Sequence, residues 1–475
     1  MSRSASVLHA TTELVPWIKT GGLADVAGAL PEALAQQGTQ NRTIVPGFPA
    51  ILEALFEAQT VYEAQGVFGT ARMRVLYGRL PGRVTEVYVI DAPSMFRRPG
   101  TPYASPQGEE WGDNLMRFAL LGWVAARLAS GEIDPNWRPD VLHVHDWHPA
   151  LAHAYLADGW SPAKTVLTIH NIDYTGRFRL QEFHRLGLPH WLAAGLGPLE
   201  FFGDLCLLKA GMILAHRVTT VSRSYAQEIL EGRHGGGLDT VARSRGDGLT
   251  GIVNGVDYGT WDPATDPLLP AQFAPNRLEG KAECKTALRA RFNLAARSMG
   301  PLFVIVSRLT LAKGLDLAAD ATEAIVEAGG QLVLVGTGDR PLEWRFQQLR
   351  DRHPQQVGVY FGYSEELAHL AIAGADVLLM PSRHEPCGLT QLYAKRYGTL
   401  PIVQATGGLV DTVDERTGFR FDERFTRLAD LVGEVARRYR DRERWLSMMA
   451  AAMLADHGWA ASAAEYQKLY DDLIA

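Results

Sequence analysis

The sequence has few cysteines, little net charge and no long uninterrupted apolar segment, and each shortage excludes a class of protein. Cys206, Cys284 and Cys387 are the only cysteines among 475 residues, and they are far apart. This spacing excludes a disulfide framework and a cysteine zinc cluster, and it fits a reducing compartment. With 47 basic and 53 acidic side chains, the formal net charge of −6 argues against a nucleic-acid partner bound by broad basic surfaces.

Membrane insertion and secretion are equally poorly supported. The most apolar long stretch, residues 115–129, carries Arg117 and Arg127 and is too short to cross a bilayer. The first residues, MSRSASVLHATTE, become polar too early for a signal-peptide core. Hydrophobic residues make up 47% of the chain and charged residues 21%, values that are ordinary for a globular protein. We therefore expect a soluble cytoplasmic protein with no membrane partner and, from its length, two to four domains.

Short apolar runs alternate with helix-length amphipathic stretches along the chain. Such alternation predicts parallel sheets covered by helices on both faces, an α/β class. The expected helices include residues 115–129, 281–292 and 365–375. The expected strands are 141–146, 165–171 and 217–222 in the first half, and 302–308, 331–336, 357–362, 376–381 and 400–404 in the second.

A Gly-, Pro- and Asp-rich segment at 254–270 interrupts this alternation. Turn-forming residues of this kind predict a break between domains. The sequence therefore predicts two doubly wound α/β domains facing an interdomain cleft, with ligands beyond the carboxyl ends of the strands.

Two glycine pairs form a long-range repeat, because TGGLAD at 20–25 matches TGGLVD at 406–411 in five of six positions. Each pair precedes a stretch with a helical pattern. Paired glycines allow a ligand to approach the backbone closely, and N–H groups at a helix start attract phosphate. One copy in each expected domain favours two anion-binding loops, although two unrelated glycine turns would give the same pattern. Lys19 would add a full positive charge beside the first loop, unless it is simply a solvated surface lysine.

Charged residues also follow two of the expected strands in the second half. Arg308 and Lys313 come directly after the strand at 302–306 and could neutralise a phosphate leaving group without a metal ion, or form a weak surface pair. Glu385 follows the strand at 376–381, and residues 387–390 are expected to open a helix. Its carboxylate could bind sugar hydroxyls, or only stabilise a helix start.

The histidine-rich run at 143–148 requires a test for metal binding. His143 and His145 would share one face of a strand, but no further cluster with ligand spacing follows. We favour a strand end that presents Asp146 and Trp147 to a polar substrate, with His170 at the end of the next strand. No G-x-S-x-G or G-x-x-x-x-G-K-[ST] motif occurs, and Gly336-Thr-Gly338 does not complete a dinucleotide fingerprint.

Taken together, these motifs resemble those of the bacterial glycogen synthases and plant starch synthases, which are retaining glucosyltransferases with a GT-B fold. The resemblance covers nearly the whole chain. The matching segments are 19-KTGGLADVAGALP-31, 143-HVHDWHPAL-151, 169-IHNIDYTG-176, 251-GIVNGVDYGTWDP-263, 307-SRLTLAKGLD-316, 383-RHEPCGLTQLYAKRYGTLP-401 and 458-GWAASAAEYQKLY-470. Wider GT-B relatives often carry a second glutamate eight positions after the first, where this chain has Tyr393, in agreement with the synthase branch.

The resemblance implies two Rossmann-like domains, at residues 1–255 and 256–455, and a C-terminal helix at 456–475 that crosses back to the first domain. It also implies ADP-glucose as donor substrate, an α-1,4-glucan as acceptor, and no metal or other cofactor. The residues expected to contact the donor are Lys19, Gly21, Gly22, Asp25, Tyr363, Cys387, Gly388, Leu389 and Thr390. The expected catalytic residues are Glu385, Arg308, Lys313, His170 and Asp146.

The function implied is therefore transfer of glucose from ADP-glucose to the non-reducing end of a glucan with retention of configuration. Two alternatives remain open from the sequence. One is another GT-B enzyme, such as a UDP-glucose-dependent transferase or a sugar-nucleotide epimerase. The other is a non-catalytic glucan-binding protein, which the presence of Lys19, Arg308, Lys313 and Glu385 disfavours.

Overall fold

The chain divides into two compact units, each with its own parallel sheet. The computed structural model describes residues 4–159 and 161–475. Unit 1 comprises residues 1–255 and 459–475, and unit 2 comprises residues 256–458. The final segment joins unit 1 from residue 459, three residues later than the 456 expected from the sequence. Among the described residues, no helix has the length and apolarity needed to cross a membrane.

Unit 1 is built on a nine-stranded sheet in the order β12-β11-β7-β6-β1-β2-β5-β4-β3. The strands from β12 to β5 run parallel, and β4 and β3 add an antiparallel edge. Their bounds are β1 Ser6–Ala10, β2 Gln40–Pro46, β3 Phe56–Ala64, β4 Met73–Arg79, β5 Glu86–Asp91, β6 Val141–His145, β7 Lys164–Ile169, β11 Arg217–Thr220 and β12 Leu249–Gly251. A separate antiparallel sheet contains β8 Arg177–Arg179, β10 Asp204–Cys206 and β9 Glu200–Phe201.

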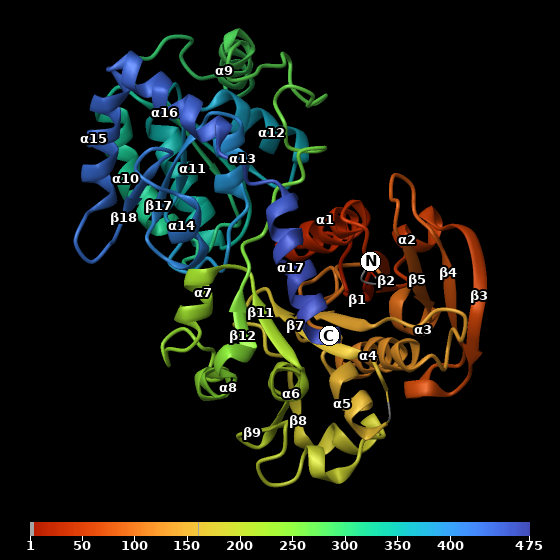
Figure 1. Ribbon diagram of the computed structural model, residues 1–475. Helices are drawn as coiled ribbons and strands as arrows, with labels where there is room; N and C mark the ends of the chain where they lie inside the picture. Colours follow the sequence, from red (N-terminus) through yellow and green to blue (C-terminus); the bar gives the residue numbers. More distant parts are fainter. Residues whose placement is uncertain (1–3, 160) are drawn as a thin grey trace. The chain divides into compact units, whose positions relative to one another are not determined.

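The helices of unit 1 cover this sheet (Figure 1). They are α1 Gly22–Gln36, α2 Pro49–Ala54, α3 Pro93–Phe96, α4 Asn114–Ser130, α5 Leu151–Asp158, α6 Leu207–Leu214, α7 Arg223–Glu228, α8 Asp239–Ser244 and α17 Trp459–Ile474. The C-terminal helix α17 packs beside α1, and its Tyr466 and Tyr470 are fully buried with Val26 and Leu30. Helix α17 thus contributes to the core of unit 1.

Unit 2 has a six-stranded, wholly parallel sheet in the order β15-β14-β13-β16-β17-β18. Its strands are β13 Leu302–Val306, β14 Gln331–Gly336, β15 Val357–Phe361, β16 Val377–Met380, β17 Leu400–Gln404 and β18 Phe419–Phe421. Its helices are α9 Glu279–Arg291, α10 Leu315–Glu327, α11 Arg340–Arg352, α12 Glu365–Gly374, α13 Thr390–Arg396, α14 Gly407–Thr412, α15 Leu428–Tyr439 and α16 Arg442–Leu454. Separate apolar clusters lie on the two faces of the sheet, as expected when helices cover both.

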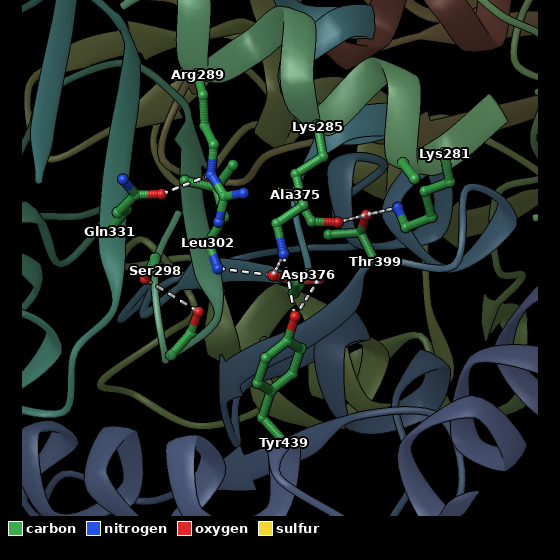
Figure 2. Close-up of polar contacts among 12 residues, drawn as sticks. Lys281, Lys285, Arg289, Ser298, Leu302, Gln331, Ala375, Asp376, Thr399 and Tyr439 are labelled. Carbon is green, nitrogen blue, oxygen red and sulfur yellow. Dashed lines mark hydrogen bonds and ion pairs between the residues drawn. The ribbon is translucent and has the colours of Figure 1, made fainter. Parts of the chain in front are cut away.

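Helix α9 is tied to this sheet by basic side chains spaced four residues apart (Figure 2). Side chains at this spacing share one face of a helix. Lys285 contacts the carboxylate of Asp376, which also accepts the backbone N–H of Leu302 at 2.7 Å. Arg289 Nε donates to Gln331 Oε1 at 2.8 Å, and Lys281 Nζ donates to the carbonyls of Ala373 and Tyr397. The helix therefore fixes the points where β13, β14 and β16 begin.

The strands predicted from apolar runs are all present, with ends that differ by a residue or two. The predicted helices at 115–129, 281–292 and 365–375 correspond to α4, α9 and α12. The strands of the first 100 residues, β1 to β5, were not predicted from the sequence. Among these, β3 is mostly exposed and lacks an apolar run, so its sequence resembles that of a loop.

Candidate active site

The candidate residues lie beyond the carboxyl ends of parallel strands in both units, as the sheet class predicts. In unit 1 they follow β1, β6 and β7, which are neighbours in the sheet. In unit 2 they follow β13, β15 and β16. Segments that are far apart in the sequence are thus brought to one edge of each sheet.

In unit 1, the glycine loop between β1 and α1 is organised by Glu13, a residue that the sequence analysis missed. Glu13 is only 2% exposed, and its carboxylate accepts the backbone N–H groups of Thr20 (2.6 Å) and Gly21 (3.3 Å). The hydroxyl of Tyr103 donates to the same carboxylate. These loop N–H groups therefore bind a protein carboxylate, and Glu13 sets the course of the backbone.

Gly21 has the features expected of a glycine that makes room for a ligand. Its φ of −165° is ordinary extended backbone, and an added Cβ would meet nothing within 4 Å. Neither torsion nor internal packing requires glycine here. Gly22 is exposed and begins α1. Lys19 Nζ lies 3.0 Å from Oδ1 of Asp25 in the first turn of that helix, so two expected donor contacts form an ion pair beside the loop.

Asp146 and His170 are brought together at the ends of β6 and β7. Asp146 Oδ1 accepts the backbone N–H of His170 at 2.7 Å. Burial raises the pKa of Asp146 to about 7 and lowers that of His170 to about 3, because a charged group loses hydration in a buried site. This part of the site therefore favours neutral side chains that bind polar groups of a ligand.

His143 and His145 lie on one face of β6 as expected, and His9 of β1 joins them, so that ring nitrogens of the three lie within 4.8 Å of one another. Both nitrogens of each ring have protein partners. His9 contacts Asn41 and His145, His143 contacts Tyr470 and Thr168, and His145 contacts His9 and His170. A metal ion would have to displace these contacts.

Trp147 packs against Gly176 and His148, so one side of its indole is covered, and its role as a sugar platform stays a prediction.

In unit 2, Lys313 and Glu385 form an ion pair between two strand-end loops. Lys313 Nζ lies 2.6 Å from Glu385 Oε2, and the side chains are 23% and 9% exposed. Arg308, in the same loop as Lys313, is exposed and makes no side-chain hydrogen bond or ion pair to any other residue that the structure describes. The loop thus presents an unneutralised guanidinium close in sequence to a lysine–carboxylate pair, which suits a multiply charged ligand.

Arg383 connects these two loops and was also missed. Its guanidinium donates to the carbonyl of Leu311 (2.9 Å) and to both carboxylate oxygens of Asp316 (2.7 and 2.9 Å). The backbone N–H of Arg383 donates to the carbonyl of Ala312. Hydrogen bonding to Asp316 raises the pKa of Arg383, so the fork stays charged and holds the Lys313 loop against the Glu385 loop.

The segment Cys387–Thr390 opens helix α13, as predicted. Leu389 caps the helix, Cys387 is buried, and Gly388 has a left-handed φ of +73°. The buried Gln391 donates from Nε2 to the carbonyls of Cys387 (3.0 Å) and Gly388 (3.1 Å). The loop is therefore held from inside by Gln391, a side chain to which the sequence alone assigned no role.

The second glycine pair differs from the prediction. Gly408 is buried, its N–H donates to the carbonyl of Glu385 at 3.0 Å, and an added Cβ would lie 2.4 Å from Cα of Cys387. The prediction that this pair offers free N–H groups to a ligand is therefore wrong for Gly408, which supports the Glu385 loop by close packing.

The two tyrosines of interest lie in different environments. Tyr363, after β15, is 73% exposed, and its hydroxyl bonds to Glu365. Its ring is thus accessible for stacking on a base. Tyr393 is buried and stacks on Trp261 with centroids 4.0 Å apart, so the position of the second glutamate in wider GT-B relatives belongs to the core of unit 2 here.

Comparisons with known proteins show which families the chain resembles. Residues 6–244 match the family model described as starch synthase catalytic domain, and residues 288–447 match glycosyl transferases group 1. Glycogen synthases of Leptothrix cholodnii and Francisella philomiragia are 46% and 43% identical, with alignments that cover 99% and 98% of this chain and all of each relative.

Solved structures show the same fold. The catalytic domain of starch synthase IV from Arabidopsis thaliana, bound to ADP and acarbose, has a TM-score of 0.88 at 29% identity and covers 99% of this chain and 100% of that one. A sucrose-phosphate synthase from Thermosynechococcus elongatus has a TM-score of 0.60 at 17% identity, covers 99% of both chains, and shares the fold. These findings confirm the predicted family and fold, and the chain belongs to the glycogen synthase and starch synthase family of retaining GT-B glucosyltransferases.

Proposed function

We propose that the protein transfers glucose from ADP-glucose to the non-reducing end of an α-1,4-glucan with retention of configuration. The observation that carries the proposal is the 2.6 Å pair of Lys313 and Glu385 in a loop system that also presents the exposed guanidinium of Arg308. A diphosphate needs cations, and a glucosyl unit needs a hydrogen-bonding carboxylate. Both occur here at adjacent strand ends.

Unit 2 would bind the nucleotide part of the donor. Arg308 and Lys313 would neutralise the diphosphate, and the start of α13 at Leu389 and Thr390 would add backbone N–H groups. The exposed ring of Tyr363 would stack on the base. ADP in the related starch synthase structure supports an adenine nucleotide.

Unit 1 would contact the sugar and diphosphate through the glycine loop and the β6–β7 ends. The open space over Gly21 would allow close approach, and Lys19 would add charge. Asp146 and His170 would bind hydroxyl groups of the glucosyl unit. The protein needs no metal ion in this scheme, because lysine and arginine carry the charge of the leaving group.

The reaction would break the bond from C1 of glucose to the β-phosphate oxygen and form one from C1 to the acceptor oxygen on the same face. The acceptor proton would pass to the departing phosphate, giving ADP. Glu385, held by Lys313, would stabilise positive charge at C1 without forming a covalent intermediate. A glucosyl adduct trapped on any side chain would contradict this step.

The decisive experiment compares transfer of radiolabel from ADP-glucose, UDP-glucose and UDP-GlcNAc into glycogen. We expect transfer from ADP-glucose, and a loss of at least about 100-fold in Glu385→Gln, because the variant removes charge stabilisation in the transition state. Glu366→Gln, which removes a carboxylate from the first turn of α12, is the matched control and keeps full activity. Preference for a uridine donor, or glucan binding without ADP release, would instead support one of the alternatives.

A further inference from the structure

A row of four side chains crosses the sheet of unit 1 and ends at His170. Asn41 lies on β2, His9 on β1, His145 on β6, and His170 directly after β7, and these strands are consecutive in the sheet. In the parallel register Asn41 pairs with Val7, two residues before His9, and His145 pairs with Thr168, two residues before His170. Alternate residues share a face of a sheet, so all four side chains lie on one face.

The row is continuously hydrogen bonded. His9 Nε2 lies 3.2 Å from Asn41 Oδ1, and His9 Nδ1 lies 3.3 Å from His145 Nε2. His145 Nδ1 lies 3.0 Å from His170 Nε2. Each central histidine thus uses both ring nitrogens within the row.

Asn41 gives the row its direction. Its Nδ2 donates to the carbonyl of Thr39 at 3.0 Å, and a carbonyl can only accept, so Oδ1 must face His9. An amide oxygen cannot donate, so the proton of His9 is on Nε2. Burial lowers the pKa of His9 to about 4, that of His145 well below its usual range and that of His170 to about 3, so each ring carries one proton at neutral pH.

The remaining protons then follow in order. Nδ1 of His9 is bare and must accept from Nε2–H of His145. Nδ1 of His145 is then bare and must accept from Nε2–H of His170. The proton of His170 is therefore on Nε2, and its Nδ1 carries a lone pair that bonds to no other residue in the described part of the chain.

We propose that Asn41 is a positioning residue that, through His9 and His145, fixes His170 as the Nε2–H tautomer, so that Nδ1 accepts a hydrogen bond from a hydroxyl group of the sugar. The assignment of His170 to the sugar rests on the proposed function, whereas the tautomer does not. A bare Nδ1 selects a hydroxyl donor over a phosphate oxygen, which can only accept.

The direct test is the protonation pattern of His170, read from its two ring ¹⁵N chemical shifts in histidine-labelled protein. His170→Gln assigns the signals by their disappearance. We expect Nδ1 to have the shift of an unprotonated nitrogen in the parent protein. In Asn41→Leu, which removes the amide acceptor at the end of the row, the two ring ¹⁵N shifts of His170 move toward each other. A protonated Nδ1 in the parent, or an unchanged pattern in Asn41→Leu, overturns the tautomer assignment whatever the enzyme transfers.

Matched variants separate polarity from packing. His9→Gln can donate to Asn41 and accept from His145, so it keeps the direction of the row, whereas His9→Phe keeps a ring but no nitrogen. Thr43→Val is the control on β2, because the buried Oγ1 of Thr43 has no hydrogen-bond partner among the residues that the structure describes. We expect the pattern of His170 to survive in Thr43→Val and His9→Gln and to be lost in His9→Phe. If Thr43→Val lost the protonation pattern of His170 to the same extent as His9→Phe, packing alone would be responsible for the pattern.

Kinetics then tests the role of the tautomer. Loss of one neutral hydrogen bond predicts that Asn41→Leu lowers kcat/KM for ADP-glucose about threefold to tenfold. With the monodeoxy donor that lacks the contacted hydroxyl, the parent and Asn41→Leu should be equal. An equal loss with every monodeoxy donor would overturn hydroxyl recognition while leaving the tautomer and the transferase activity intact.

Discussion

At the scale of single residues, Asp146 combines an unusual backbone with an unusual charge state. Its φ is +59°, a left-handed value that costs energy for a residue with a Cβ, and its carboxylate accepts two backbone N–H groups, those of His170 and Asn171. Burial is the main cause of its raised pKa, and the nearby Glu13 raises it further. The fold therefore keeps a strained, buried carboxyl at this strand end, which is typical of a functional position.

Replacing Asp146 by asparagine should remove a pH dependence of stability. The pKa of Asp146 is about 7 in the folded protein against 3.8 as the usual value, so the folded state binds the proton more tightly than the unfolded state does. Its contribution to stability is thus fully present below about pH 4 and is lost as the pH rises to about 7. At about 1.4 kcal/mol per pH unit, the loss is at most about 4 kcal/mol.

The measurement is urea unfolding of the parent and Asp146→Asn from about pH 5 to about pH 8. The stability difference, parent minus variant, should fall with rising pH and level off above about pH 7. Parallel curves across this range would show that Asp146 does not titrate there.

At the scale of elements, two site loops use glycine for opposite reasons. Gly21 has ordinary extended torsions and open space beside it, whereas Gly388 has a φ of +73° and would place a Cβ 2.4 Å from Oε1 of the buried Gln391. The first glycine leaves room outside the protein, and the second allows the chain to turn over Gln391.

Alanine at each position should separate these roles. Gly21→Ala should leave the unfolding free energy within about 1 kcal/mol and lower kcat/KM for ADP-glucose, because the methyl group occupies ligand space. Gly388→Ala should lose about 1–3 kcal/mol of stability through strain at positive φ and the contact with Gln391. Thermal unfolding and initial rates on both variants provide the check. Equal losses of stability, or full activity in Gly21→Ala, would contradict the distinction.

Burial and composition explain which strands could be predicted from the sequence. Strands buried on both faces are mainly apolar, so β13, β14 and β16 stand out as apolar runs. The antiparallel edge strand β3 is mostly exposed and has a mixed composition, so it was missed. Glu13, Arg383 and Asn41 act on segments that only strand pairing and loop packing bring near them, and no local pattern indicates such contacts. Motif resemblance located the residues after the strands but not those that hold them in place.

At the scale of the whole molecule, the chain passes between its units twice, at 255–256 and 458–459. In unit 2 the N–H of Val256 donates to the carbonyl of His457 at 2.7 Å. In unit 1 Gly255 packs so tightly on Trp459 that an added Cβ would lie 2.6 Å from its Cα. The two passages therefore lie side by side, and helix α17 follows directly from the second.

Helix α17 should therefore stabilise unit 1 and not unit 2, although it is the last segment of the chain. It buries Tyr466 and Tyr470 against α1, and its Ser462 hydroxyl donates to the carbonyl of Val253. The hydroxyl of Tyr470 lies 2.7 Å from Nδ1 of His143, and both side chains are buried. Removing residues 459–475 would expose the apolar face of α1, and Tyr470→Phe alone would cost about 1 kcal/mol for the lost hydrogen bond.

Hydrogen exchange measured peptide by peptide distinguishes the two units. In Tyr470→Phe, exchange should quicken in β1, β6 and α1, while β13, β14 and β16 keep the exchange of the parent. Deletion of 459–475 should produce the same pattern with a larger effect, or leave unit 1 unfolded while unit 2 stays protected. Lys468→Ala, an exposed change on the same helix, is the control and should alter neither unit. Faster exchange in unit 2 to the same degree as in unit 1 would show that α17 is not specific to the core in which its tyrosines lie.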